Sequence, residues 1–144
     1  VEHVKLIVDS NKGSINLNLN AKNPFINGNS NHLENIIINI LDNAVKYSKA
    51  SPFINVSTKN IDDNLEICIQ DNGIGMDKNT QKMVFEKFYR EQNGDIHDIK
   101  GHGLGLSYVK KIVDFHKGKI SLESKKGSGT KFYINIKTLT NENK

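Results

Sequence analysis

The sequence predicts an α+β fold, a two-layer sandwich in which helices cover one face of a mixed, largely antiparallel sheet. Most of the strand-like runs follow one another directly and are joined by short polar turns, without regular helical crossovers between them. Only a few segments carry the helical period of about 3.6 residues. The length of 144 residues fits a single domain with one hydrophobic core.

The first 13 residues are interpreted as the end of a linker helix that continues upstream. Apolar residues recur there at helical spacing, at Val4, Ile7 and Val8. No capping residue precedes them, and Gly13 is expected to close the helix in a left-handed cap. The strictly alternating run at 15–19 predicts a half-buried strand, and 24–27 is expected to form another short strand.

A long helix is predicted at 31–48. Side chains able to cap its start occur at three successive positions, Asn29, Ser30 and Asn31. Pro52 forbids its continuation. The elements expected after it are strands at 53–59 and 65–70, helices near 78–85 and at 104–116, and strands at 118–123 and 129–138.

Composition excludes several classes of protein. The net charge of +4 comes from scattered lysines, without the basic stripe and interleaved aromatics of nucleic-acid binders, so no nucleic-acid partner is expected. The single cysteine, Cys68, excludes an internal disulfide and suits a reducing compartment. The sequence has neither an apolar run of about 20 residues nor a signal peptide, so the domain is expected to be soluble and cytoplasmic.

The helix at 31–48 has two different faces. At about 100° per residue, Asn39, Asn43 and Lys46 fall within roughly 60° of one another, and Tyr47 flanks them. The opposite face is apolar and consists of Leu33, Ile37, Ile40, Leu41, Ala44 and Val45. The polar stripe fits either a solvated face or a site for Mg²⁺, phosphate and a flat base.

Three glycine-rich turns follow in the sequence. Asp71-Asn-Gly-Ile-Gly75 comes directly after a predicted strand, so it places a carboxylate beside glycines that permit close backbone approach to a ligand. Gly101-His-Gly-Leu-Gly105-Leu106 opens a helix, where backbone N–H groups attract phosphate. Gly127-Ser-Gly-Thr130 joins two strands. Each turn taken alone is also compatible with a purely structural role.

Together, the order and spacing of these motifs resemble the nucleotide-binding domain of sensor histidine kinases. The resemblance covers about residues 31–136. Its motifs correspond to that family's N, G1, F, G2 and G3 boxes, which here are Asn39-x-x-x-Asn43, Asp71-x-Gly73-x-Gly75, Phe85-Glu-Lys-Phe88-Tyr-Arg90, Gly101-x-Gly103-Leu-Gly105-Leu and Gly127-x-Gly129-Thr.

The resemblance implies the Bergerat ATP-binding sandwich, with ATP and Mg²⁺ as cofactors. Asn43 matches the family's Mg²⁺ ligand, and Asn39 is expected to assist the metal or the phosphates. Lys46 corresponds to a phosphate contact and Tyr47 to a residue that packs on the adenine. Asp71 corresponds to the carboxylate that accepts a hydrogen bond from the adenine amine.

The remaining implied contacts come from the glycine turns and the segment between them. Gly73 and Gly75 shape the adenine pocket, Thr130 lies near the adenine, and Arg90 contacts a phosphate. Residues 91–102 correspond to the family's ATP lid. The triphosphate is expected to contact Gly101, His102, Gly103, Leu104, Gly105 and Leu106. His102 departs from the small residue or threonine common at its position, which leaves the phosphate role of the glycines intact.

The resemblance also implies phosphoryl transfer in place of hydrolysis. Related ATPases carry a glutamate one helical turn before the metal-binding asparagine, whereas this chain has Asn39, and an amide cannot act as a general base. Glu34 lies on nearly the opposite helix face. The family's nucleophile is a histidine on a separate helical hairpin, and none of the five histidines here has that sequence context. The phosphoacceptor is therefore expected upstream of Val1.

The implied partners are ATP, the histidine-bearing dimerisation domain of the same parent protein, and a response regulator. The parent protein is expected to be dimeric, and anchoring in the inner membrane is left open. Two alternatives use the same fold: a serine kinase of the anti-sigma-factor type and a non-catalytic nucleotide-binding module.

Overall fold

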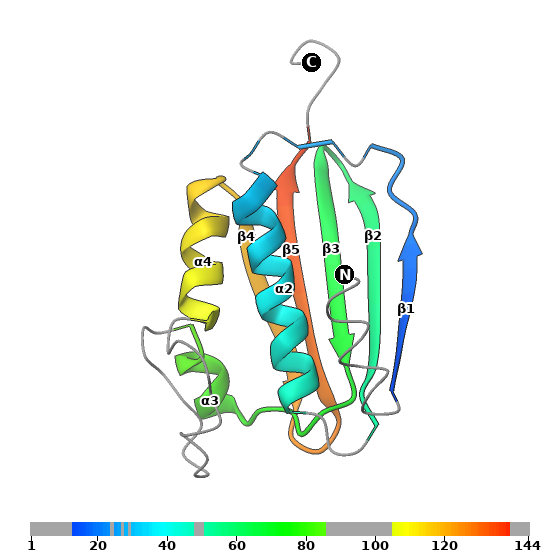
Figure 1. Ribbon diagram of the computed structural model, residues 1–144. Helices are drawn as coiled ribbons and strands as arrows, with labels where there is room; N and C mark the ends of the chain where they lie inside the picture. Colours follow the sequence, from blue (N-terminus) through cyan, green and yellow to red (C-terminus); the bar gives the residue numbers. More distant parts are fainter. Residues whose placement is uncertain are drawn as a thin grey trace.

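The computed structural model describes residues 13–23, 25–26, 28, 30–47, 51–85 and 105–138. They form a two-layer sandwich in which helices lie against one face of a five-stranded sheet of order β1-β2-β3-β5-β4 (Figure 1). The strands are β1 (Ser14–Leu19), β2 (Phe53–Ile61), β3 (Asn64–Asp71), β4 (Lys119–Lys125) and β5 (Gly129–Lys137). The helices are α2 (Ser30–Lys46), α3 (Lys78–Met83) and α4 (Gly105–Phe115). The predicted fold class is confirmed.

The sheet is mixed and mostly antiparallel, as predicted. Strand β1 runs parallel to β2, and the other neighbouring pairs are antiparallel. The β2–β3 hairpin closes through Asp62 and Asp63, and Asp62 takes the left-handed conformation with φ of 54°. In the predicted strand at 24–27, Ile26 makes only an isolated bridge to Thr138. Pro24 and Asn27 are outside the described residues.

The core lies between α2, α4 and the helix-facing side of the sheet. Helix α2 buries Ile40, Leu41 and Ala44, as its apolar pattern predicts, together with Ile36, which the sequence interpretation omitted. Helix α4 packs beside α2 and contributes Val109 and Val113. The sheet contributes Ile54, Val56, Ile69, Phe132, Ile134 and Ile136. This packing directs the polar stripe of α2 away from the core.

Gly13 differs from its prediction. It does not take a left-handed conformation, so the expected left-handed cap at this residue is wrong. A Cβ at Gly13 would lie 2.2 Å from the carbonyl oxygen of Pro52, and the adjacent Ser14 N–H donates to that oxygen at 2.8 Å. Glycine is therefore needed where β1 starts against Pro52. The helix predicted at 1–10 is outside the described residues.

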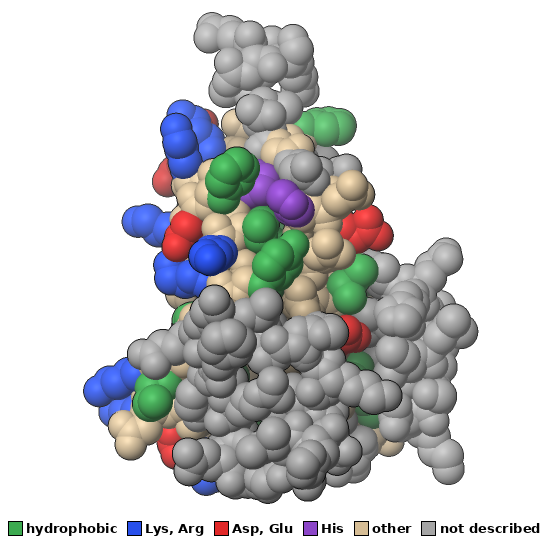
Figure 2. Space-filling model, turned by 60° about the vertical axis from the view of Figure 1, so that its left-hand side comes forward, with side chains coloured by type: hydrophobic (Ala, Val, Ile, Leu, Met, Phe, Trp, Pro, Cys, Tyr) green, Lys and Arg blue, Asp and Glu red, His purple; other side chains and the backbone are tan. Residues whose placement is uncertain are grey.

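The outer edge of the sheet at β4 is charged. Lys119, Glu123 and Lys125 are exposed on this strand, and lysine side chains gather along the left side of the view in Figure 2. Charged side chains on an edge strand oppose its pairing with another chain. Within the described residues, no helix is long and apolar enough to cross a membrane.

Two isoleucines of α2 test this packing. Ile36 is 1% exposed, whereas Ile38, two residues later, is only partly buried. Ile36→Ala is expected to lower the free energy of unfolding by about 2–5 kcal/mol, because it removes buried methyl groups and leaves a cavity. Ile38→Ala is the matched control and is expected to cost less in urea denaturation. Equal losses would contradict the orientation of α2.

Candidate functional site

A row of polar side chains crosses three strands at one end of the sheet. Thr130 on β5 is the register partner of both Asp71 on β3 and Ser124 on β4. Residues paired in this way have side chains on the same face, which here is the helix-covered face. The next residues of that face along the same strands, Ile69, Phe132 and Leu122, belong to the core cluster or pack against it. The face therefore changes from apolar to polar at this row.

Asp71 is held by backbone donors. Its Oδ1 atom accepts a hydrogen bond from the Gly73 N–H at 2.8 Å. Burial raises the pKa of the Asp71 carboxyl, and hydrogen bonds from the backbone N–H groups of Gly73 and Thr130 oppose that rise. A carboxylate accepts more hydrogen bonds than these, so Asp71 retains capacity for a donor on a ligand.

The end of α2 and two turns meet next to this row. The Ile74 N–H donates to the carbonyl oxygen of Tyr47 at 3.0 Å, and the Ile74 carbonyl oxygen accepts from the Gly127 N–H at 2.6 Å. Through Ile74, the turn after β3 is thus bonded to both α2 and the β4–β5 turn. We call this three-way contact the backbone junction.

Three glycines allow the segments at the backbone junction to approach closely. A Cβ at Gly73 would lie 2.6 Å from the Tyr47 carbonyl oxygen. At Gly75, which has φ of +70°, it would lie 2.1 Å from the Lys125 carbonyl oxygen. At Gly129, which has φ of +100°, it would lie 2.1 Å from the Asp71 carbonyl oxygen. No other residue type fits these positions without moving the backbone.

Helix α2 presents its amides on the side away from the core. Asn39 and Asn43 are partly exposed and Lys46 is exposed. The Asn39 Nδ2 atom donates to the Asn35 carbonyl oxygen at 2.9 Å, and this bond leaves the amide oxygen available to a ligand. The Asn43 carbonyl oxygen accepts from the N–H of Tyr47 at 3.0 Å, which places the stripe next to the backbone junction.

Several residues that the resemblance assigned to the site are outside the described residues. These are Arg90, the segment 91–102 that contains Gly101 and His102, and also Gly103 and Leu104. Gly105 is the first residue of α4. Leu106 is partly buried and packs against the hydrophobic core.

Two residues in the surroundings of the site were missed by the sequence analysis. The Ser124 Oγ atom accepts from the Met76 N–H at 2.7 Å. The Gln81 Nε2 atom donates to the Met76 carbonyl oxygen at 2.9 Å and to the Ser124 carbonyl oxygen at 3.1 Å. Strand alternation places Ser124 on the face of Leu122, but no sequence motif indicates these long-range bonds.

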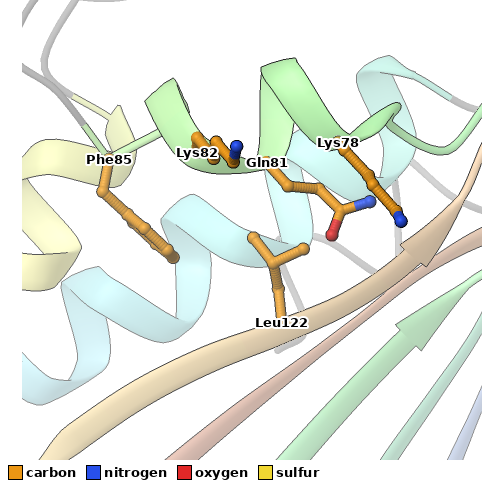
Figure 3. A pocket seen from close by; sticks show the side chains of 5 residues that line it. All are labelled: Lys78, Gln81, Lys82, Phe85 and Leu122. Carbon is orange, nitrogen blue, oxygen red and sulfur yellow. The ribbon is translucent and has the colours of Figure 1, made fainter.

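An open hollow of about 430 Å³ lies between α3 and β4. Figure 3 shows its lining, with the side chain of Gln81 directed from α3 toward the strand. The lining residues are Lys78, Gln81, Lys82, Phe85 and Leu122. None of them belongs to the row of polar side chains or to the α2 stripe, but Gln81 donates to the carbonyl oxygen of Ser124, so the hollow borders the row.

Comparison with known proteins assigns the family. The model of the histidine kinase-, DNA gyrase B-, and HSP90-like ATPase family matches residues 28–140. The chain belongs to this family. It is 50% identical over 139 residues to the sensor protein RprX of Bacteroides fragilis, which covers 95% of this chain and 27% of RprX. The chain thus spans about a quarter of the length of such relatives.

Solved structures agree with this assignment. The mycobacterial sensor histidine kinase MprB matches with a TM-score of 0.78 and 29% identity, over 94% of this chain and 89% of that one. Full-length ShkA in complex with AMPPNP matches in fold with a TM-score of 0.81 and 22% identity, over 96% of this chain and 29% of that one. The chain is the ATP-binding catalytic domain of a sensor histidine kinase, the class to which these relatives belong.

Gly129 and Gly127 give a matched test of the backbone junction. Both have positive φ, but a Cβ at Gly127 would have nothing within 4 Å, whereas at Gly129 it would meet the Asp71 carbonyl. Gly127→Ala is expected to cost about 1 kcal/mol of stability through backbone strain. Gly129→Ala is expected to cost more and to abolish nucleotide binding, as measured by thermal melting and calorimetric titration. Similar effects of the two substitutions would count against the close packing.

Proposed function

We propose that the chain binds Mg·ATP and supplies the site for transfer of the γ-phosphoryl group to a histidine on a separate domain of the same parent protein. The observation that carries this proposal is the backbone junction. It brings the proposed acceptors for the base, Asp71 on β3 and Thr130 on β5, next to the face of α2 that carries the asparagine amides. The family assignment adds ATP as the nucleotide.

Asp71 and Thr130 are proposed to recognise the adenine. The Asp71 carboxylate accepts from the exocyclic amine, and its orientation is fixed beforehand by the Gly73 N–H at 2.8 Å. Thr130 is 5% exposed and is adjacent to Asp71 in the register. Gly73 and Gly75 keep side chains out of the space beside the turn. Tyr47 is proposed to pack on the base from the end of α2.

The donor set on α2 fits a magnesium ion. Mg²⁺ prefers oxygen ligands and keeps several waters and phosphate oxygens, so it needs few protein ligands. Asn43 offers an amide oxygen as a direct ligand, and Asn39 offers one to the metal-bound water or a phosphate. Lys46, exposed at the end of the helix, is proposed to contact a phosphate as a point charge. The metal neutralises phosphate charge when it is bound.

The same helix argues against hydrolysis. Activation of water needs a general base near the metal, and Asn39 has an amide at the position one turn before Asn43. Glu34 is exposed, nine residues before Asn43 and on nearly the opposite side of the helix. The chain's groups therefore provide position and charge stabilisation, as phosphoryl transfer requires. Arg90 and the 91–102 lid, with the glycines that follow it, are proposed to complete the phosphate site.

The partners of this domain are proposed on the same grounds. The acceptor is a histidine on the dimerisation domain of the parent protein, and the phosphoryl group then passes to a response regulator. The relatives that match this chain are several times longer, which is consistent with additional domains.

Asn43→Ala tests the metal assignment. The substitution is expected to abolish Mg·ATP-dependent labelling of a histidine hairpin supplied in trans, because the direct metal ligand is lost. Labelling is measured with ATP carrying a radioactive γ-phosphate. Asn31→Ala, at an exposed position near the start of the same helix, is the control and is expected to retain labelling. Undiminished labelling by Asn43→Ala would refute this role of Asn43.

Asp71→Asn tests recognition of the base. It is expected to weaken ATP selectively, because the amide replaces part of the acceptor with a donor, while GTP changes little. The raised pKa means that the wild-type carboxylate is lost, as pH falls, at a higher pH than an ordinary aspartate. The preference for ATP over GTP should therefore fall as the Asp71 carboxylate becomes protonated. The Asp71→Asn variant has no carboxylate at this position, so its preference should not change over the same pH range.

Stability separates this effect from misfolding. Because the folded-state pKa of Asp71 is raised, its contribution to stability is greatest at low pH and is lost as pH rises through that pKa. Asp71→Asn is therefore not expected to lower the melting temperature at pH 7. Equal weakening of ATP and GTP by a normally folded variant would contradict adenine readout by Asp71.

A further inference from the structure

Ser124 makes three hydrogen-bond contacts with a single hydroxyl group. It accepts from the Met76 N–H at 2.7 Å, donates to the Gly129 carbonyl oxygen at 2.9 Å, and lies 2.8 Å from the Thr130 Oγ1 atom. A serine hydroxyl has one hydrogen and two acceptor lone pairs. Since the hydrogen is used on Gly129, all three contacts are satisfied only when the Thr130 hydroxyl donates to Ser124.

This direction of donation determines what Thr130 presents to the site. With its only hydrogen used on Ser124, the Thr130 hydroxyl has lone pairs alone for other partners. Thr130 is also adjacent to Asp71 on the next strand, with the side chain on the same face. An ionised Asp71 likewise offers only acceptors. The two side chains thus form one acceptor surface.

We propose that Ser124 is a positioning residue for base selection, which acts by holding the Thr130 hydroxyl as an acceptor beside Asp71. Such a surface favours a base that presents an amine at this position. It opposes a base with a carbonyl oxygen there, because acceptors would then face acceptors without a hydrogen between them. This inference rests on the proposed binding of ATP, and it adds a specificity-determining residue outside the sequence motifs.

Gln81 holds the same serine in a different way. Its Nε2 atom donates to the backbone carbonyl oxygens of Met76 and Ser124, at 2.9 and 3.1 Å, and Figure 3 shows the side chain reaching from α3 toward β4. These bonds fix the backbone around Ser124 but do not involve the Thr130 hydroxyl. Gln81→Met therefore removes two hydrogen bonds to the backbone around Ser124, while the Thr130 hydroxyl still donates to the Ser124 hydroxyl.

The test uses displacement of a fluorescent ATP analogue from the full chain by ATP and by inosine triphosphate, which has an oxygen in place of the adenine amine. Ser124→Ala frees the Thr130 hydrogen and is expected to lower the preference for ATP about fivefold, the typical effect of one hydrogen bond. Ser124→Thr, which keeps a hydroxyl, should retain the preference. Ser121→Ala, at an exposed position of the same strand, should not change it.

Two further variants separate positioning from general support of the fold. Gln81→Met is expected to weaken both nucleotides by a similar factor. In a Thr130→Val background, Ser124→Ala should not change the preference further, since the hydroxyl it acts through is missing. If Ser124→Ala does not fold, Ser124→Cys, with its weaker hydrogen bonds, is expected to show the same loss of preference.

An unchanged preference in a folded Ser124 variant, or an undiminished effect of Ser124→Ala in the Thr130→Val background, would overturn the inference. Either result leaves the proposed function standing if the wild-type chain still prefers ATP. A wild-type chain with no preference for ATP over inosine triphosphate would overturn both the inference and the proposed recognition of the adenine amine by Asp71, and a wild-type chain that does not bind ATP would overturn the proposed function.

Discussion

The site depends on the backbone junction, where Ile74 is bonded to Tyr47 on one side and to Gly127 on the other. Backbone groups that are removed from water need partners, so these bonds set the separation of three segments that are far apart in the sequence. The separation is small enough that Gly73, Gly75 and Gly129 have no room for a Cβ. The glycines are therefore a consequence of how closely the segments must pack to form the site.

The core positions the two sides of the site relative to each other. Helix α2 buries Ile36, Ile40 and Leu41 in the core, and the adjacent face, with Asn39 and Asn43, stays partly exposed. The helix-facing side of the sheet changes from apolar to polar at the row of Asp71, Thr130 and Ser124. The residues proposed to recognise the base on the sheet and those proposed to bind the metal on the helix therefore lie on adjacent elements.

The helix and strand periods of the sequence were sufficient to predict the fold class and most of the elements. Angular spacing predicted most of the two faces of α2, since they depend on local geometry, but it left out the buried Ile36. Residues such as Gly73, Asp71 and Thr130 were found because they belong to ordered motifs. Ser124 and Gln81 belong to no motif, and their bonds to Met76 depend on the pairing of β4 with β5 and on the docking of α3. Sequence periodicity contains no information about such long-range contacts. The left-handed cap expected at Gly13 was wrong for a related reason, because this glycine makes room for Pro52, a distant residue.

We propose above that the row of polar side chains recognises the adenine and that α2 holds the metal. A crystal structure of this chain with Mg²⁺ and the non-hydrolysable analogue AMPPNP tests it most directly. The adenine amine is expected within hydrogen-bond distance of the Asp71 carboxylate, next to Thr130, and the metal is expected to be coordinated by the Asn43 amide oxygen. A nucleotide bound elsewhere, such as in the hollow between α3 and β4, or a metal without contact to Asn43, would contradict it.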